Sequence, residues 1–445
     1  MREMKDSGVK WIGKIPVTWK VSKLKYVFAD GDEGLKIGPF GSAMKGKTLE
    51  EGPYKIYNQA HLIQNDFSLN RHFVSEDTFN ELINYEVHPG DILFSMMGTI
   101  GKCQIMPEGF TKGIMDSHLL KSGIKDNINP YFLVYAYDKD YSDQAYTQLL
   151  YASNGTIMNG LNSSILKSVV IALPPKNEQD RIVDYLDSKC SKIDEIIAKQ
   201  EKIIEKLKEY KLSIITEAVT KGLDSNVYMR NTGNKYIGAI PATWEVRKLK
   251  TLSSIISKGT TPSTVGREIL NEGLIRFIKA ENIQNNKLLE NPAFFIDSET
   301  NEIIKRSQLQ ENDILFVIAG ATIGKTAIIG KEFTPANTNQ AVSFIRLLDE
   351  NESKYVWYSL QADHMQHMLK IFATQAAQPN LAMEDLGNYI VLLPSREERN
   401  IIVSFLDTKC STIDCMVKNK ENIIGKLQEY KKSLIYEVVT GKKEV

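Results

Sequence analysis

The first candidate for chemistry is a glycine-rich stretch, residues 319–326, that ends in Gly324-Lys325-Thr326 and lacks one glycine of a phosphate-binding P-loop. In a P-loop the lysine opens a helix, whereas here Gly330 follows within five residues, and residues 96–103 repeat the pattern around Lys102. Two strands joined by a glycine-rich turn explain both copies, so we favour a turn over nucleotide binding. Either lysine could still contact a nucleic-acid phosphate.

Two further segments invite a catalytic or metal interpretation. His364 and His367 could lie on one helical face, but no Cys, Asp or Glu is arranged with them as a third metal ligand. Asn129-Pro130-Tyr131-Phe132 is similar to the loop with which amino-methyltransferases hold a flipped adenine, but it lacks the second proline and an accompanying methyl-donor loop. An X-Pro turn before a helix explains it better.

No Ser-His-Asp or Cys-His set has a recognisable spacing, and no paired catalytic carboxylates are evident. We therefore predict a non-catalytic chain with no catalytic, cofactor-binding or metal site of its own.

Polar loops beside cations suggest nucleic-acid contacts instead. Asn and Gln suit adenine edges, Lys suits guanine or phosphate, and Thr can offer a methyl group to thymine. Any one of them could equally be an ordinary loop residue, because Asn, Gly and Thr also make turns, and that alternative stays open. The candidate DNA-binding residues are Ser42, Lys45, Lys47, Asn58, Gln59, His61, Lys102, Asn154, Thr156, Asn159, Lys258, Thr260, Thr261, Lys279, Asn282, Lys325, Gln375, Gln378 and Asn380.

Two long helices must position these loops. From Val183 to Ala218 apolar residues recur at alternating spacings of three and four, which predicts a coiled-coil seam on one helix after Pro174-Pro175 and before Gly222. The same seam starts again 220 residues later at Val403. Equal length and matched register favour antiparallel pairing of the two helices within one chain.

The rest of the chain is also duplicated. An Ile-Pro-x-x-Trp segment ends at Trp19 and recurs at Trp244, and we expect each to pack against a helix end. Between segment and helix lie short alternating apolar runs that predict a strand-rich globule. The fold class is α+β, with two related α/β globules separated by the paired helices and a pseudo-two-fold symmetry. The predicted parts are an anchor at 1–25, a globule at 26–173, a helix at 174–226, an anchor at 227–250, a globule at 251–393 and a helix at 394–445.

Composition sets outer limits. With 55 basic and 55 acidic residues the chain has no net charge, so a nucleic acid would have to be held by local basic patches. No apolar run reaches the roughly 18 residues of a membrane span and no signal peptide is evident, so we expect a cytoplasmic protein. Cys190 and Cys410 fall on the seams, and neither Cys103 nor Cys415 has a neighbour at metal-ligand spacing, so we expect neither disulfides nor zinc.

The order of four motifs resembles the specificity subunit of Type I restriction-modification systems. These motifs are the Ile-Pro-x-x-Trp anchors, Gly-Pro-Phe-Gly-Ser at 38–42, Gly-Asp-Ile-Leu-Phe at 90–94, and Leu-Pro-Pro-x-x-Glu-Gln at 173–179. The second half departs from the pattern, because it lacks Gly-Pro-Phe-Gly-Ser and reads Leu393-Pro394-Ser395 before its helix.

The resemblance implies two target recognition domains, each of which reads one half of a bipartite site in double-stranded DNA. It implies that the paired helices set the spacer and dock two methyltransferase subunits, which restriction/translocase subunits join. The subunit would have no activity or cofactor of its own; S-adenosylmethionine, ATP and Mg would belong to the partner subunits. A competing hypothesis is a coiled-coil interaction scaffold whose globules bind peptides, and the salt dependence of DNA binding would separate the two.

Overall fold

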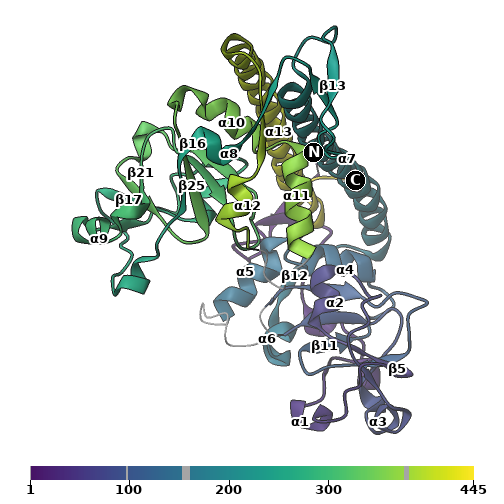
Figure 1. Cartoon of the computed structure of the whole chain (residues 1–445). Coiled ribbons are helices and arrows are strands. Elements are labelled where there is room, and N and C mark those ends of the chain that lie inside the picture. Colours follow the sequence, from purple (N-terminus) through teal and green to yellow (C-terminus); the bar gives the residue numbers. More distant parts are fainter. Residues whose placement is uncertain (1, 97–98, 153–160, 375–379) are drawn as a thin grey trace. The chain divides into compact units, whose positions relative to one another are not determined.

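The computed structural model describes residues 2–96, 99–152, 161–374 and 380–445 (Figure 1). The chain folds as two compact units. Unit 1 comprises Met1–Gln200 and Glu421–Val445, and unit 2 comprises Glu201–Lys420. Each unit therefore contains one globule and part of both long helices.

The two long helices are α7 (Lys176–Lys221) and α13 (Arg396–Val439). Pro174 and Pro175 come before α7, and Gly222 ends it with a left-handed φ of +77°. Residue 200 in α7 and residue 420 in α13 mark the division between units, so both helices run from one unit into the other. The first helix thus begins after Pro174-Pro175 and ends before Gly222, as predicted, and the helical residues form only part of the predicted segments 174–226 and 394–445.

Within unit 1 the two helices run antiparallel. The Lys431 ammonium on α13 lies 2.7 Å from the Asp194 carboxylate on α7, and Lys443 lies over the ring of Tyr185. Lys443 follows Lys431 in the sequence, whereas its contact Tyr185 precedes Asp194, so the two segments run in opposite directions. Buried seam residues such as Leu186 and Leu434 belong to one hydrophobic core.

Unit 2 repeats this arrangement with the other ends of the helices. Lys211 on α7 pairs with Asp414 on α13 at 2.6 Å, and Gly222 lies against the Glu398 side chain. Ile215 and Leu406 belong to the core of this unit. The antiparallel pairing predicted from the matched seams is confirmed in each unit.

Each Ile-Pro-x-x-Trp segment packs its tryptophan against the end of a long helix, as predicted. β1 (Met4–Asp6) pairs with β2 (Lys14–Pro16), and β13 (Met229–Asn231) pairs with β14 (Ala239–Pro241). Trp19 is buried beside Gly441 at the end of α13, and the Trp244 indole N–H donates to Glu398 at 3.1 Å. Each segment continues into a strand that joins globule to helix: β3 (Lys20–Lys23) pairs with β12 (Val170–Leu173), and β15 (Glu245–Lys248) pairs with β26 (Ile390–Leu393).

The globule of unit 1 holds two four-stranded sheets. The first has the order β6 (Phe73–Val74), β5 (Tyr54–Tyr57), β10 (Gly113–Met115), β7 (Glu86–Val87). The second has the order β4 (Lys36–Ile37), β11 (Leu119–Ser122), β8 (Ile92–Ser95), β9 (Cys103–Ile105). Its helices are α1 (Gly41–Met44), α2 (Gln59–Gln64), α3 (Glu76–Glu81), α4 (Pro130–Tyr137), α5 (Asp143–Ala152) and α6 (Ser163–Ser168), with 3-10 turns at Leu24–Tyr26, Gly31–Glu33 and Ile83–Tyr85.

The globule of unit 2 has the same two sheets. Their orders are β20 (Phe295–Ile296), β17 (Ile275–Ile278), β24 (Ala336–Thr338), β21 (Gln308–Leu309), and β16 (Ser253–Lys258), β25 (Val342–Leu347), β22 (Ile314–Val317), β23 (Thr326–Ile328). Its helices are α8 (Leu249–Leu252), α9 (Ser298–Ile303), α10 (Ser353–Ser359), α11 (Asp363–Thr374) and α12 (Met383–Gly387). Its 3-10 turns are Pro262–Val265, Ala280–Asn282, Lys305–Ser307, Lys331–Phe333 and Glu350–Glu352.

One element distinguishes the second globule. A short hairpin, β18 (Ile283–Gln284) and β19 (Lys287–Leu288), lies in the connection from β17 to β20. The matching connection in unit 1, residues 58–72, is described throughout and contains α2 without a hairpin. The shared sheets with different connections confirm a common frame that carries variable loops.

Candidate nucleic-acid interface

Each glycine-rich stretch connects two antiparallel strands, as the sequence indicates. β22 pairs antiparallel with β23, with Phe316 opposite Thr326, and β8 pairs antiparallel with β9, with Phe94 opposite Cys103. No helix begins at Lys325. The segment therefore does not have the strand-to-helix geometry of a nucleotide-binding loop.

The Gly-Pro-Phe-Gly-Ser loop of unit 1 is held against the connection between β10 and β11. The Gly38 N–H donates to the Leu119 carbonyl at 2.9 Å, and a Cβ at Gly38 would lie 1.8 Å from the Asp116 carbonyl oxygen. Only glycine permits this approach. The loop then presents Phe40, with 84% of its surface exposed, and the exposed residues Ser42 and Lys45.

A loop of different sequence occupies the equivalent place in unit 2. A Cβ at Gly259 would lie 2.1 Å from the Thr338 carbonyl oxygen, and the Thr260 N–H donates to that same oxygen at 2.9 Å. The neighbouring Thr261 hydroxyl donates to Gln340, which lies in the connection between β24 and β25. Lys258, on the other side of Gly259, is exposed. Each unit thus offers a glycine-anchored polar loop at the same point of its fold.

Asn58, Gln59 and His61 shape a second loop of unit 1. The Asn58 side chain accepts from the Ala60 N–H at 3.0 Å, and the His61 ring accepts from the Asn58 N–H at 3.1 Å, so the two residues cap α2. His61 is fully buried, and burial lowers its pKa. Gln59 accepts from the Ser95 hydroxyl at 3.4 Å. A direct base contact by His61 has no support in this geometry, whereas Asn58 and Gln59 are half-buried at the loop surface.

Lys279 and Asn282 form the equivalent loop of unit 2. The buried Asn282 amide accepts from the Lys279 N–H at 3.0 Å and donates to the Pro292 carbonyl at 2.7 Å. Its hydrogen bonds are thus used within the globule. The Lys279 ammonium is half-buried over the ring of Phe294.

Lys102 is committed to an ion pair. Its side chain is 7% exposed, and its ammonium lies 3.4 Å from Asp138 and 2.5 Å from Asp140. Burial alone would lower the pKa of this ammonium, but the two carboxylates reverse the effect and leave the pKa raised. A phosphate would have to displace both. The geometry therefore does not support the predicted phosphate contact of Lys102. The sequence did not reveal this because Asp138, which binds the ammonium, lies 36 residues away.

The remaining candidate residues differ in whether their side chains can reach DNA. Lys47 pairs with Glu81 at 2.6 Å. Lys325 is half-buried and has no carboxylate partner among the described residues, and Asn380 is exposed beside its bridge to Ala319. Asn154, Thr156, Asn159, Gln375 and Gln378 lie outside the described residues.

The histidine pair does not form a metal site. His364 is buried with its Nε2 atom 2.6 Å from the Tyr389 hydroxyl, whereas His367 packs edge-on against Tyr236. Across the described ranges no group of three His, Cys, Asp or Glu side chains could hold a metal ion, and no described helix is long and apolar enough to cross a membrane. Asn129 caps α4, whose first residue is Pro130, as the X-Pro interpretation predicts.

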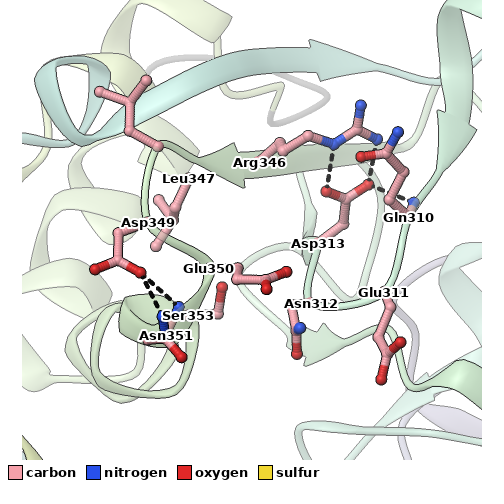
Figure 2. Close-up of a pocket in the computed structure, with 11 residues that line it drawn as sticks. Gln310, Glu311, Asn312, Asp313, Arg346, Leu347, Asp349, Glu350, Asn351 and Ser353 are labelled. Atoms are coloured by element: carbon pink, nitrogen blue, oxygen red, sulfur yellow. Dashed lines mark hydrogen bonds and ion pairs between the residues drawn. The ribbon is translucent and has the colours of Figure 1, made fainter.

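An acidic cavity of about 430 Å³ lies at the ends of β22 and β25 in unit 2 (Figure 2). Arg346 is paired there with Asp313 at 2.7 Å, and the carboxylates of Glu311, Asp349 and Glu350 also line the cavity. Figure 2 shows the guanidinium turned toward Asp313, away from the other carboxylates. Because carboxylates outnumber the single cation, this cavity does not suit a phosphate.

A family model described as the Type I restriction modification DNA specificity domain matches residues 16–209 and again 241–424. These two matches cover most of the chain and follow its internal duplication. The chain belongs to this specificity family.

Relatives of the specificity chain extend over most of its length. It is 25% identical over 372 residues to the Type I restriction enzyme EcoBI specificity subunit of Escherichia coli, covering 80% of this chain and 74% of the relative. It is 26% identical over 447 residues to a putative Type I restriction enzyme MjaX specificity subunit of Methanocaldococcus jannaschii, covering 97% and 95%. A solved chain described under "Structural basis underlying complex assembly and conformational transition of the type I R-M system" shares the fold, with a TM-score of 0.67, 14% identity and coverage of 96% and 99%.

The specificity chain also carries a second apolar stripe that sequence reasoning missed. Exposed side chains recur every seven residues on both helices, and the two sets are offset by 220 residues: Ile196, Ile203 and Tyr210 on α7, and Met416, Ile423 and Tyr430 on α13. The signal was present as a heptad spacing beside the main seam. Exposed apolar rows on paired helices are typical of protein docking surfaces.

Proposed function

We propose that this chain is the sequence-specific DNA-binding subunit of a Type I restriction-modification complex and that each globule reads one half of a bipartite site. The observation that carries this proposal is the pair of loops anchored at Gly38 and Gly259, which occupy the same place in two copies of one fold yet differ in sequence. Two globules with the same fold but different loop sequences can each bind a different half-site. A peptide-binding scaffold is not favoured by membership of the specificity family.

DNA binding tests this proposal directly. Phosphate contacts release counterions, so the affinity of the purified chain for duplex DNA that contains its site should fall steeply with salt. Filter binding from roughly 50 to 200 mM salt measures the slope. A chain that binds this duplex no better than a scrambled one, with no salt dependence, would not be a specificity subunit.

The catalytic work belongs to partners in this proposal. Two methyltransferase subunits would modify adenine and restriction/translocase subunits would cut, in the cytoplasm, where the chromosome and invading DNA lie. S-adenosylmethionine, ATP and Mg²⁺ would be bound by those subunits. The purified chain with S-adenosylmethionine should transfer no methyl group to duplex DNA, and transfer by the chain alone would contradict the assignment.

The exposed apolar stripe supports the helices as the docking surface. Unit 1 carries Ile196, Ile423 and Tyr430, and unit 2 carries their counterparts Met416, Ile203 and Tyr210. A duplicated set suits two copies of one partner. Ile203→Glu and Ile423→Glu should each weaken binding of a methyltransferase subunit, while Lys202→Glu, at a neighbouring exposed position, should not.

A further inference from the structure

A cluster of tyrosine, aspartate and lysine side chains lies where the helix pair meets the globule in unit 1. The Tyr135 hydroxyl donates to Asp187 at 2.6 Å, and the Lys431 ammonium donates to Asp194 at 2.7 Å. With Glu195 these residues line a cavity of about 580 Å³. We call this set the unit 1 cluster.

Unit 2 holds a copy of the same set. The Tyr358 hydroxyl donates to Asp407 at 2.9 Å, and the Lys211 ammonium donates to Asp414 at 2.6 Å. The helix residues of this unit 2 cluster stand 220 positions from their counterparts, and they line a cavity of about 490 Å³. The two clusters are therefore equivalent positions of the duplicated fold.

The unit 2 cluster is filled by this chain's own hairpin. Lys287, on β19, places its ammonium 3.1 Å from Asp414, and Asn286 at the hairpin turn donates to Gln361 at 2.7 Å. A further ammonium, from Lys354, lies 2.6 Å from Asp407. Both aspartates thus receive a cation from the globule.

Among the residues of unit 1 that the structure describes, no such element covers the unit 1 cluster. The connection that would supply it, residues 58–72, contains α2 and no hairpin. The Asp194 side chain is 55% exposed, whereas that of Asp414 is 30% exposed. Glu195 adds a carboxylate where unit 2 has Cys415. Three carboxylates in the unit 1 lining therefore face one ammonium, that of Lys431.

We propose that the unit 1 cluster receives a lysine or arginine side chain from a loop of the methyltransferase subunit, as the unit 2 cluster receives Lys287. This inference rests on the proposed function. The filled copy shows that this arrangement of side chains holds a second ammonium, and the uncompensated carboxylates of the open copy favour a cation. The Tyr141 ring, which already lies 5.9 Å from the Lys431 ammonium, adds an aromatic wall. The two methyltransferase subunits consequently dock through unequal contacts.

The test uses the complete chain and the purified methyltransferase subunit, with native mass spectrometry for stoichiometry and calorimetry for affinity. Glu195 makes no polar contact with any described residue, so Glu195→Lys should fold normally, which thermal melting checks. We expect it to weaken one of the two binding events by about tenfold or more. Cys415→Lys, the matched change in unit 2, should alter neither event by more than about twofold, because Lys287 already fills that cluster.

Equal effects of the two variants, or no effect of Glu195→Lys, would overturn the proposal. If Glu195→Lys failed to fold, Glu195→Gln would remove the charge without reversing it, and unchanged binding would again contradict the inference. Absence of any methyltransferase binding by the wild-type chain would reject the docking itself, while DNA binding measured separately by filter assay would still report on the proposed function.

Discussion

Two lysines that occupy matched turns have opposite environments. Lys102 is buried between Asp138 and Asp140, while Lys325 has no carboxylate partner among the described residues. Removing one member of a buried pair leaves an uncompensated charge and costs roughly 3–5 kcal/mol. Lys102→Met should therefore lower the free energy of unfolding by about that amount.

Lys325→Met should instead leave stability unchanged, weaken binding to all duplexes alike and reduce the salt slope by about one unit. Urea denaturation and filter binding measure the two effects. A Lys102→Met chain of normal stability with weakened DNA binding would reverse this assignment.

The buried His364 should make unit 2 sensitive to acid. Burial lowers its pKa from 6.5 to about 4, so the unfolded chain binds a proton between these values while the folded chain does not. Stability from this group is complete above pH 6.5 and is lost as the pH falls toward 4, by about 3 kcal/mol in total. His364→Phe, which keeps the ring against Tyr389, should flatten this part of the profile of urea midpoint against pH. An unchanged slope would show that other groups cause it.

At the scale of elements, the glycine-anchored loops should be sensitive to one methyl group. Gly38→Ala would place a Cβ 1.8 Å from the Asp116 carbonyl oxygen and must move the loop that carries Phe40 and Lys45. We expect loss of discrimination at one half-site and an intact second half. Gly425→Ala is the matched control, because a Cβ at this position in α13 meets nothing within 4 Å. Alanine also stabilises a helix by about 1 kcal/mol relative to glycine. Binding to duplexes altered in either half measures the outcome, and unaltered discrimination by Gly38→Ala would remove this loop from recognition.

Elements with a local signal could be predicted from the sequence, and those that depend on distant partners could not. The long helices follow from seam spacing and from Pro174-Pro175 and Gly222, and the turn at Lys325 follows from the early Gly330. The burial of Lys102 depends on Asp138, which no local pattern connects to it. The Gly38 and Gly259 loops could be matched by their place in each half, but the close backbone approach that both glycines make could not be predicted, because the two loops share no surrounding side-chain pattern.

At the scale of the whole molecule, the continuity of α7 and α13 through both units makes the helix pair a candidate ruler for the gap between half-sites. Because the helices are antiparallel, both must lengthen together, by duplicating residues 197–203 and 417–423. One heptad adds roughly 10 Å of rise, equivalent to about three base pairs. The methylated motif of this variant should gain a longer unread spacer. An unchanged spacer in a stably folded variant would show that other contacts set the distance.

The separate reading of two half-sites is tested most directly by exchange of one globule. Residues 26–173 would be replaced by those of another family member, and the methylated motif would be read by methylome sequencing of cells that also carry the methyltransferase subunit. Because base contacts lie within a globule and the second globule is untouched, the motif should change in one half and keep the other. A motif altered in both halves, or in neither, would contradict the account.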